Sequence, residues 1–217
     1  MRLVVFDVDG TLVDSQADIV ASMAAAFAAV NLDAPSRSDI LSIVGLSLPV
    51  AMEALAPDAD TPMMVEAYKD SYARLRVSKG ASSSPLYPGA RAALDRLQAR
   101  DDILLGVATG KSKRGLDGLI EAHGLEGMFI TRQVADFHPS KPHPSMLLTA
   151  MEDAGVTAQA AVMIGDTSFD ADMAQAARMP FIGVDWGYHP TDRLQGAHSV
   201  LSDFSELDDA LGAVWAD

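Results

Sequence analysis

LVVFDVDGTLV, residues 3–13, opens the chain after two residues and sets the expected architecture. Its first four residues are apolar and include two valines, which predicts a short buried strand. The strand runs into Asp7 and Asp9, and the glycine that follows them is typical of a tight turn. Two acids one residue apart at a strand end can divide chemical work, one attacking a substrate while the other transfers protons. The simpler alternative is a pair of turn or helix-capping acids.

The periodicity of the remaining sequence divides the chain into two parts. From residue 15 to about residue 80 the apolar spacing is helical, and helices are expected at 15–30, 40–44, 49–55 and 61–80. A small, polar stretch at 81–85 predicts a linker. Beyond it, strands are expected at 103–108, 128–131, 160–164, 181–185 and 199–201, alternating with helices at 89–100, 113–123, 145–154, 169–177 and 206–215.

Alternating strands and helices imply parallel strands joined by right-handed crossovers. We therefore expect an α/β fold, with a doubly wound, Rossmann-like parallel sheet and an inserted all-helical domain. The expected boundaries are 1–14 and 85–217 for the α/β core domain and 15–84 for the helical insertion.

Composition limits the classes of partner. The 217 residues carry a formal net charge of −14, which disfavours nucleic acid as a partner because its phosphates would be repelled. The chain contains no cysteine, so disulfides, thiolate metal sites and a cysteine nucleophile are excluded. The N-terminal apolar run is too short for a signal peptide or a membrane span, and we expect a soluble, cytoplasmic protein without membrane contact.

Three more polar clusters follow or flank expected strands. In the first, the Thr109 hydroxyl and the Gly110 amide can hold phosphate oxygens, although Thr109 could instead cap a helix. In the second, Lys141 lies between prolines as a positioned charge, although it could be an ordinary loop lysine. In the third, Asp166 and Asp170 can hold a metal, although acids also favour helix starts. Because the carboxyl ends of parallel strands share one edge, we expect these clusters to meet Asp7 there.

Together the four motifs resemble those of the haloacid dehalogenase superfamily, in the order expected for its magnesium phosphatases and over essentially the whole chain. The nearest resemblance is to phosphoglycolate phosphatase-like members, and the insertion looks like their small helical cap. The resemblance implies that Asp7 is the nucleophile, forming an aspartyl-phosphate, and that Asp9 is the general acid and base. It also implies that Thr109 and Lys141 hold the phosphate, and that Mg²⁺ is bound by Asp7, Asp166 and the backbone carbonyl of Asp9, with Asp170 steadying them.

Electrostatics agree with these roles. Mg²⁺ prefers oxygen ligands, and two like charges about 4 Å apart repel by roughly 4 kcal/mol at an effective dielectric near 20. Mg²⁺ and Lys141 would offset this repulsion between Asp7 and an anionic phosphate. The presence of Asp9 argues against a dehalogenase function. The dehalogenases of this superfamily lack the second acid, because a halide leaves without a proton. The expected function is therefore a magnesium-dependent phosphatase acting on a small phosphorylated metabolite; the alternatives are a phosphosugar mutase of the same superfamily and a non-catalytic phospholigand-binding protein.

The turn after the fourth motif and the charged side chains of the insertion concern local structure and substrate choice, not the class of protein. Relatives usually read Ala-Gly after the fourth motif, whereas this chain has Arg178 there, at a cost of about 1 kcal/mol in a left-handed turn. The loop at 45–47 could face the site. Four cap side chains could meet a second anionic group on the substrate: Arg37, Lys69, Arg74 and Arg76. The sequence does not select among them and does not define the substrate or the oligomeric state.

Overall fold

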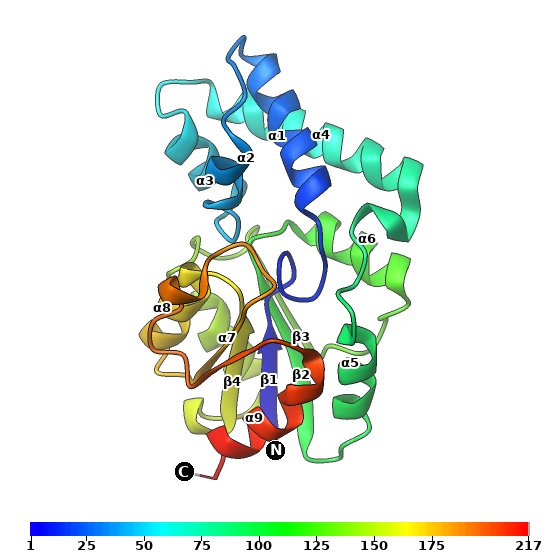
Figure 1. Cartoon of the computed structure of the whole chain (residues 1–217), viewed down its shortest axis with the longest axis vertical. Coiled ribbons are helices and arrows are strands. Elements are labelled where there is room, and N and C mark those ends of the chain that lie inside the picture. Colours follow the sequence, from blue (N-terminus) through cyan, green and yellow to red (C-terminus); the bar gives the residue numbers. More distant parts are fainter. Residues whose placement is uncertain (217) are drawn as a thin grey trace.

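The computed structural model, which describes residues 1–216, contains one sheet of six parallel strands in the order β3-β2-β1-β4-β5-β6. The expected doubly wound α/β fold is confirmed (Figure 1). The strands are β1 (Arg2–Phe6), β2 (Ile103–Thr109), β3 (Thr131–Val134), β4 (Ala161–Gly165), β5 (Phe181–Val184) and β6 (Ser199–Leu201).

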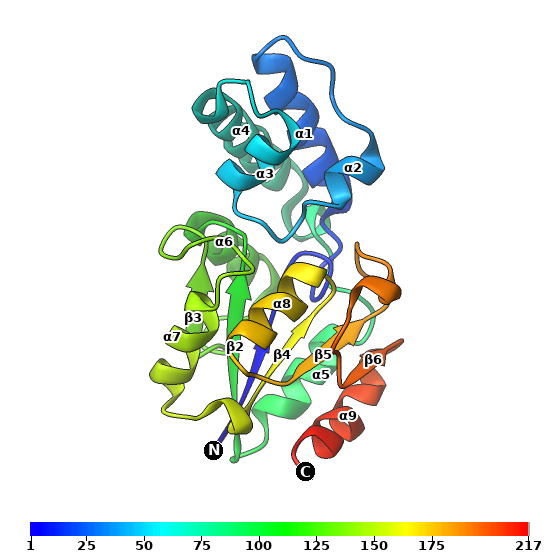
Figure 2. The same ribbon diagram turned by 90° about the vertical axis from the view of Figure 1, so that its left-hand side faces the viewer.

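Helices cover both faces of the sheet, so the central strands are apolar on both sides (Figure 2). Val4 and Phe6 of β1 pack toward one face with α5, α6 and α9, whereas Leu3 and Val5 pack toward the other with α7 and α8. The five helices are α5 (Ala90–Gln98), α6 (Lys113–His123), α7 (Ser145–Ala154), α8 (Ser168–Ala176) and α9 (Leu207–Val214).

One predicted strand is displaced. Residues 128–131 were expected to be extended, but β3 begins only at Thr131. Met128 and Phe129 are buried in the connection that precedes the strand, and their apolar character produced the error. The true strand is an edge strand whose Thr131 and Gln133 hydrogen-bond to Asp153, so its sequence is too polar to resemble a buried strand.

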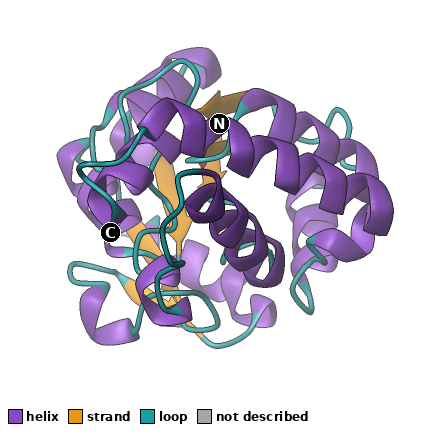
Figure 3. Ribbon diagram, turned by 90° about the horizontal axis from the view of Figure 1, so that it is seen from above, coloured by secondary structure: helices purple, strands orange, loops and turns teal. Residues whose placement is uncertain are grey.

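The insertion consists of helices that stand beyond the carboxyl ends of the strands (Figures 1 and 2). Viewed from above, these helices lie in front of the sheet (Figure 3). They form their own apolar cluster, centred on Met23, Met52 and Met64. The helices are α1 (Gln16–Ala29), α2 (Arg37–Leu41), α3 (Leu48–Leu55) and α4 (Thr61–Lys79), and the expected linker includes a short 3₁₀ helix, η1 (Gly80–Ser83).

Two chain segments connect the insertion to the sheet, and they lie side by side. The Asp14 amide donates to the carbonyl oxygen of Pro85 at 2.9 Å. Asp18, fully buried in the first turn of α1, accepts from Lys79 at 2.5 Å and from Ser83. The start of α1 and the end of α4 are thereby fixed to each other. Among the described residues, no helix is long and apolar enough to cross a membrane.

Candidate active site

The strand order places the candidate residues at one edge of the sheet. Strand order reverses between β1 and β4, and ligands of open α/β sheets bind at such a point, beyond the carboxyl ends of the strands. Asp7 follows β1, Asp166 follows β4, and Thr109 is the last residue of β2. These three residues are far apart in sequence, and the parallel pairing brings them to neighbouring strand ends.

Lys141 joins two of the acids. Its ammonium group donates to Asp7 Oδ1 at 2.8 Å and to Asp170 Oδ1 at 2.7 Å, and its side chain has no exposed surface. Asp170 also accepts from the backbone and the hydroxyl of Thr167 in a capping box at the start of α8. Asp170 therefore takes part in a helix cap, as the simpler interpretation expected, and it also fixes a buried lysine.

Asp166 is held by the loops around it. Oδ1 accepts from the Thr11 hydroxyl and Oδ2 from the backbone amide of Tyr188, each at 2.8 Å. Gly10, with φ +89°, and Gly187 lie so close that a Cβ at either position would overlap the Asp166 carboxylate. The tight turn expected after the first two acids thus leaves room for the third.

The donor set fits a divalent cation. Asp7, Asp166 and Asp170 are buried, and each offers an oxygen within 4.8 Å of the others. Burial, opposed by Lys141 and aided by Asp170, raises the pKa of Asp7 to about 7. Burial and the charges of Asp170 and Asp7 likewise raise the pKa of Asp166. Within residues 1–216, Asp7 Oδ2 has no hydrogen-bond partner. Because one lysine cannot balance three carboxylates, a hard cation with oxygen ligands, such as Mg²⁺, suits this cluster.

The Asp9 side chain is directed away from this cluster. Its Oδ1 accepts from the Ser15 hydroxyl at 2.5 Å, and its Oδ2 lies 2.9 Å from the Lys111 ammonium. The Asp9 side chain is therefore not part of the cluster formed by Asp7, Asp166 and Asp170. Burial lowers the pKa of Lys111, but the charge of Asp9 and the nearby Tyr72 outweigh burial and raise it. The Asp9 carboxylate is thus held separately from the cluster that contains Asp7.

Three residues of this arrangement had been given no role from the sequence. Lys111 follows Thr109 and Gly110 directly, and that adjacency was a signal that could have identified it. Ser15 lies directly before α1, and its hydroxyl donates to Asp9 and contacts the Tyr188 hydroxyl at 3.1 Å. Tyr188 gave no signal, because this contact spans 173 residues.

Thr109 and Gly110 lie where β2 ends and the loop to α6 begins. Thr109 is 1% exposed and accepts from the Lys111 amide at 3.2 Å. It is not the cap of α6, because Ser112 has that position and accepts from the Gly115 amide. A Cβ on Gly110 would lie 2.5 Å from the Gly45 carbonyl oxygen, so the loop of the insertion rests directly on this glycine.

A cavity of about 360 Å³ lies between this rim and the insertion, with Asp7, Asp9 and Thr109 in its wall. Of the four cationic side chains of the insertion that could meet a second anionic group, Lys69 and Arg76 line the cavity. Arg37 and Arg74 are not part of its wall, and Arg37 instead hydrogen-bonds the Gln16 side chain.

Known proteins resemble the chain over nearly its whole length. The family model described as "Haloacid dehalogenase-like hydrolase" matches residues 4–184. A curated Dickeya dadantii protein named "Probable phosphatase IndB" is 36% identical, covering 94% of this chain and 91% of that protein. A phosphoglycolate phosphatase of Agrobacterium fabrum is 33% identical, covering 96% and 91%. The crystal structure of a Pseudomonas syringae hydrolase has a TM-score of 0.86 at 24% identity, covering 98% of this chain and 99% of that one. The chain belongs to the haloacid dehalogenase-like hydrolase family.

Proposed function

We propose that this protein is a Mg²⁺-dependent phosphatase that hydrolyses a small phosphate monoester through an aspartyl-phosphate on Asp7. The observation that carries the proposal is the state of Asp7, which borders the cavity beneath the insertion. One of its carboxylate oxygens is held by Lys141, and the other is buried without a hydrogen-bond partner among the described residues. The family and the phosphatase names of the two curated relatives support it.

The two acids would act in sequence. An Asp7 oxygen attacks phosphorus, the bond from phosphorus to the ester oxygen breaks, and Asp9 gives a proton to the departing alkoxide. Asp9 then takes a proton from water, whose oxygen attacks the aspartyl-phosphate and releases inorganic phosphate. Ser15 and Lys111 each hold one oxygen of Asp9, which supports its role as a positioned proton carrier.

Other groups would hold the phosphoryl group in place. Thr109, the Gly110 amide and Lys141 would bind its oxygens. Asp7, Asp166, Asp170 and the Asp9 carbonyl would hold Mg²⁺. When bound, Mg²⁺ supplies positive charge that reduces the repulsion between Asp7 and the anionic substrate. Lys141 supplies further positive charge and orients the Asp7 carboxylate by donating to Oδ1.

The same proposal includes the organisation of the chain. Residues 15–84 would act as a cap, and residues 1–14 and 85–217 would form the catalytic core. Asp217 lies outside the described part of the chain. The partner would be a small phosphorylated metabolite rather than nucleic acid or membrane, and the compartment would be the cytoplasm. Supporting this division, the helices of the insertion have an apolar cluster separate from the two clusters of the sheet.

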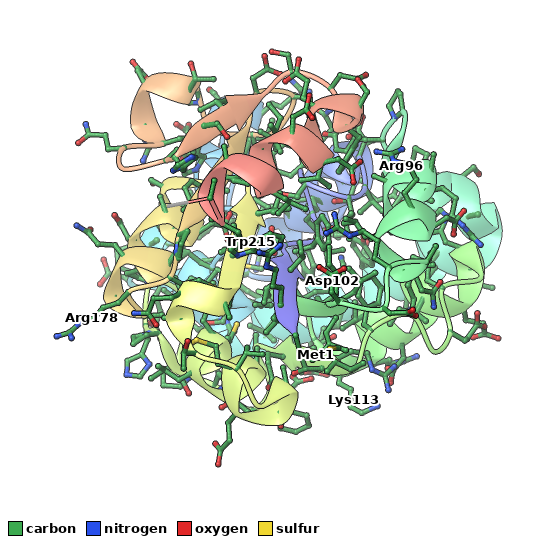
Figure 4. All side chains as sticks on the ribbon, turned by 90° about the horizontal axis from the view of Figure 1, so that it is seen from below. Met1, Arg96, Asp102, Lys113, Arg178 and Trp215 are labelled. Carbon is green, nitrogen blue, oxygen red and sulfur yellow. The ribbon has the colours of Figure 1, made fainter. Side chains whose placement is uncertain are left out.

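The Asp7→Asn variant tests the nucleophile. We expect phosphate release from p-nitrophenyl phosphate with Mg²⁺ to fall by more than about 10³-fold, because an amide oxygen is a poor nucleophile. Chelation of divalent ions should abolish wild-type release, and added Mg²⁺ should restore it. Asp102→Asn is the matched control, because Asp102 lies at the opposite end of the sheet and pairs only with surface arginines (Figure 4).

Each contrary result has a defined meaning. Near-full turnover by Asp7→Asn would show that the nucleophile is assigned wrongly. Transfer of phosphate to a sugar without net release would favour a mutase. Binding of phosphate esters without turnover by the wild type would favour a non-catalytic binding protein.

A further inference from the structure

The cavity above Asp7 is larger than a two-carbon substrate needs. Its volume of about 360 Å³ lies within the range of about 300–1,000 Å³ typical of pockets that hold drug-sized ligands. The phosphoryl group would occupy the end beside Asp7 and Thr109. The remainder of the volume is available to the leaving alcohol, and glycolate would fill only a small part of it.

The wall around that remaining space is mainly apolar and comes from the insertion. Ile19 and Met23 of α1 are 4% and 1% exposed, and both contribute side chains to it. Tyr68 and Tyr72 of α4 add two rings with centroids 6.0 Å apart and planes 15° apart. Val44, Leu46, Leu48 and Ala51 contribute further apolar surface.

The cations near this space are already engaged or exposed. Lys69 pairs with Glu66 at 3.1 Å and its side chain is 44% exposed. Arg76 donates to the Arg114 carbonyl oxygen at 3.0 Å, and the Arg114 side chain is exposed to solvent. Lys111 lies against Asp9. A carboxylate on the substrate would have to compete with these contacts, whereas an apolar group would not.

We propose, building on the phosphatase function above, that the substrate is the phosphate monoester of an alcohol with an apolar, ring-sized body. A polyhydroxylated sugar fits less well, because its hydroxyls would face Ile19, Met23 and Val44 without hydrogen-bond partners. An apolar ring would instead displace water from this wall and pack against Tyr72.

The first experiment compares three alkyl phosphates on the wild-type protein with Mg²⁺: benzyl phosphate, 2-phosphoglycolate and glucose 6-phosphate. All three leave as alkoxides, so differences in kcat/KM report recognition more than leaving-group chemistry. We expect benzyl phosphate to exceed each of the others by about tenfold or more. An equal or higher value for 2-phosphoglycolate or glucose 6-phosphate would overturn the inference and leave the phosphatase function intact. No phosphate release from any of the three esters would overturn both.

A second experiment tests whether the cavity is responsible for the preference for benzyl phosphate. Ala73 lies on α4 in the cavity wall and is partly exposed, so Ala73→Phe should narrow the space without disturbing the core. We expect kcat/KM for benzyl phosphate to fall by about tenfold while that for 2-phosphoglycolate changes less than about threefold. Val77→Phe is the matched control, because Val77 is one turn further along α4, 84% exposed and outside the cavity wall. An equal loss on both esters by a folded Ala73→Phe variant would contradict the inference.

Discussion

Arg178 closes helix α8 in the left-handed conformation, with φ +57°. For a residue with a Cβ this conformation costs about 1–2 kcal/mol, which glycine avoids. Arg178→Gly should therefore raise the free energy of unfolding by about 0.5–1 kcal/mol, after the greater entropy of glycine in the unfolded chain is subtracted. The side chain extends from the periphery of the molecule, so its removal leaves no cavity (Figure 4). Urea denaturation with an unchanged m value measures the effect.

Asn31 supplies the control for this substitution. It has the same φ of +57°, but asparagine adopts this conformation more readily than arginine. Asn31→Gly should therefore stabilise the protein less than Arg178→Gly. A stability of Arg178→Gly at or below that of the wild type would show that the turn is not strained.

Single residues differ in how far the sequence alone could place them. The convergence of Asp7, Thr109 and Asp166 follows from parallel pairing, because each residue ends or follows a strand. The contact of Tyr188 with Ser15 depends on the path of a loop, and no local pattern encodes that path. The direction of the Asp9 carboxylate was likewise unpredictable, because Lys111 and Ser15 fix it.

At the scale of elements, apolar content predicted buried strands well and edge strands poorly. β1 and β4 are buried along almost their whole length, so their runs of apolar residues identified them. In β3, the Thr131 and Gln133 side chains donate hydrogen bonds to Asp153 of α7. The sequence alone could not assign this partner. Hydrophobicity alone therefore put this strand three residues too early.

The loop between β5 and β6 makes stability depend on pH through His189. This residue is 2% exposed; Nδ1 accepts from the Ser168 amide at 3.1 Å, and Nε2 faces the Ser42 carbonyl oxygen of the insertion at 3.0 Å. Burial and the charge of Arg193 lower the pKa of His189, although Ser42 and Asp170 oppose this. The unfolded chain, with an ordinary histidine pKa near about 6.5, then binds the proton more readily than the folded chain.

The sign of the effect follows from this difference. The contribution of neutral His189 to stability is complete above about pH 6.5 and is lost as the pH falls below that value. We expect the free energy of unfolding to decrease between pH 7 and pH 5.5, and His189→Gln to reduce this decrease. His198→Gln, at an exposed histidine, is the control and should keep the wild-type pH dependence. Identical pH profiles for His189→Gln and the wild type would refute the assignment.

At the scale of the whole molecule, the insertion meets the core at the site itself. The Ser47 amide donates to the Ser140 hydroxyl at 2.9 Å, next to Lys141. Gly45 lies against Thr167, where a Cβ would approach the hydroxyl oxygen to 3.2 Å. Residues 45–47 therefore contact two of the loops that hold the candidate catalytic residues. Such contact ties the position of the insertion to the geometry of the acids.

Gly110 makes this closure testable. A Cβ there would lie 2.5 Å from the Gly45 carbonyl oxygen and 2.7 Å from that of Leu46, and backbone atoms cannot yield as a flexible side chain can. Gly110→Ala keeps the backbone N–H that would face the phosphate, and the added Cβ meets the loop of the insertion directly. We expect kcat/KM for phosphate release to fall by about tenfold or more, while the free energy of unfolding changes by less than about 1 kcal/mol. Gly212→Ala, where the added Cβ meets no atom of the described residues within 4 Å, should leave kcat/KM unchanged. Wild-type kcat/KM in Gly110→Ala would mean that turnover does not require this contact between insertion and core.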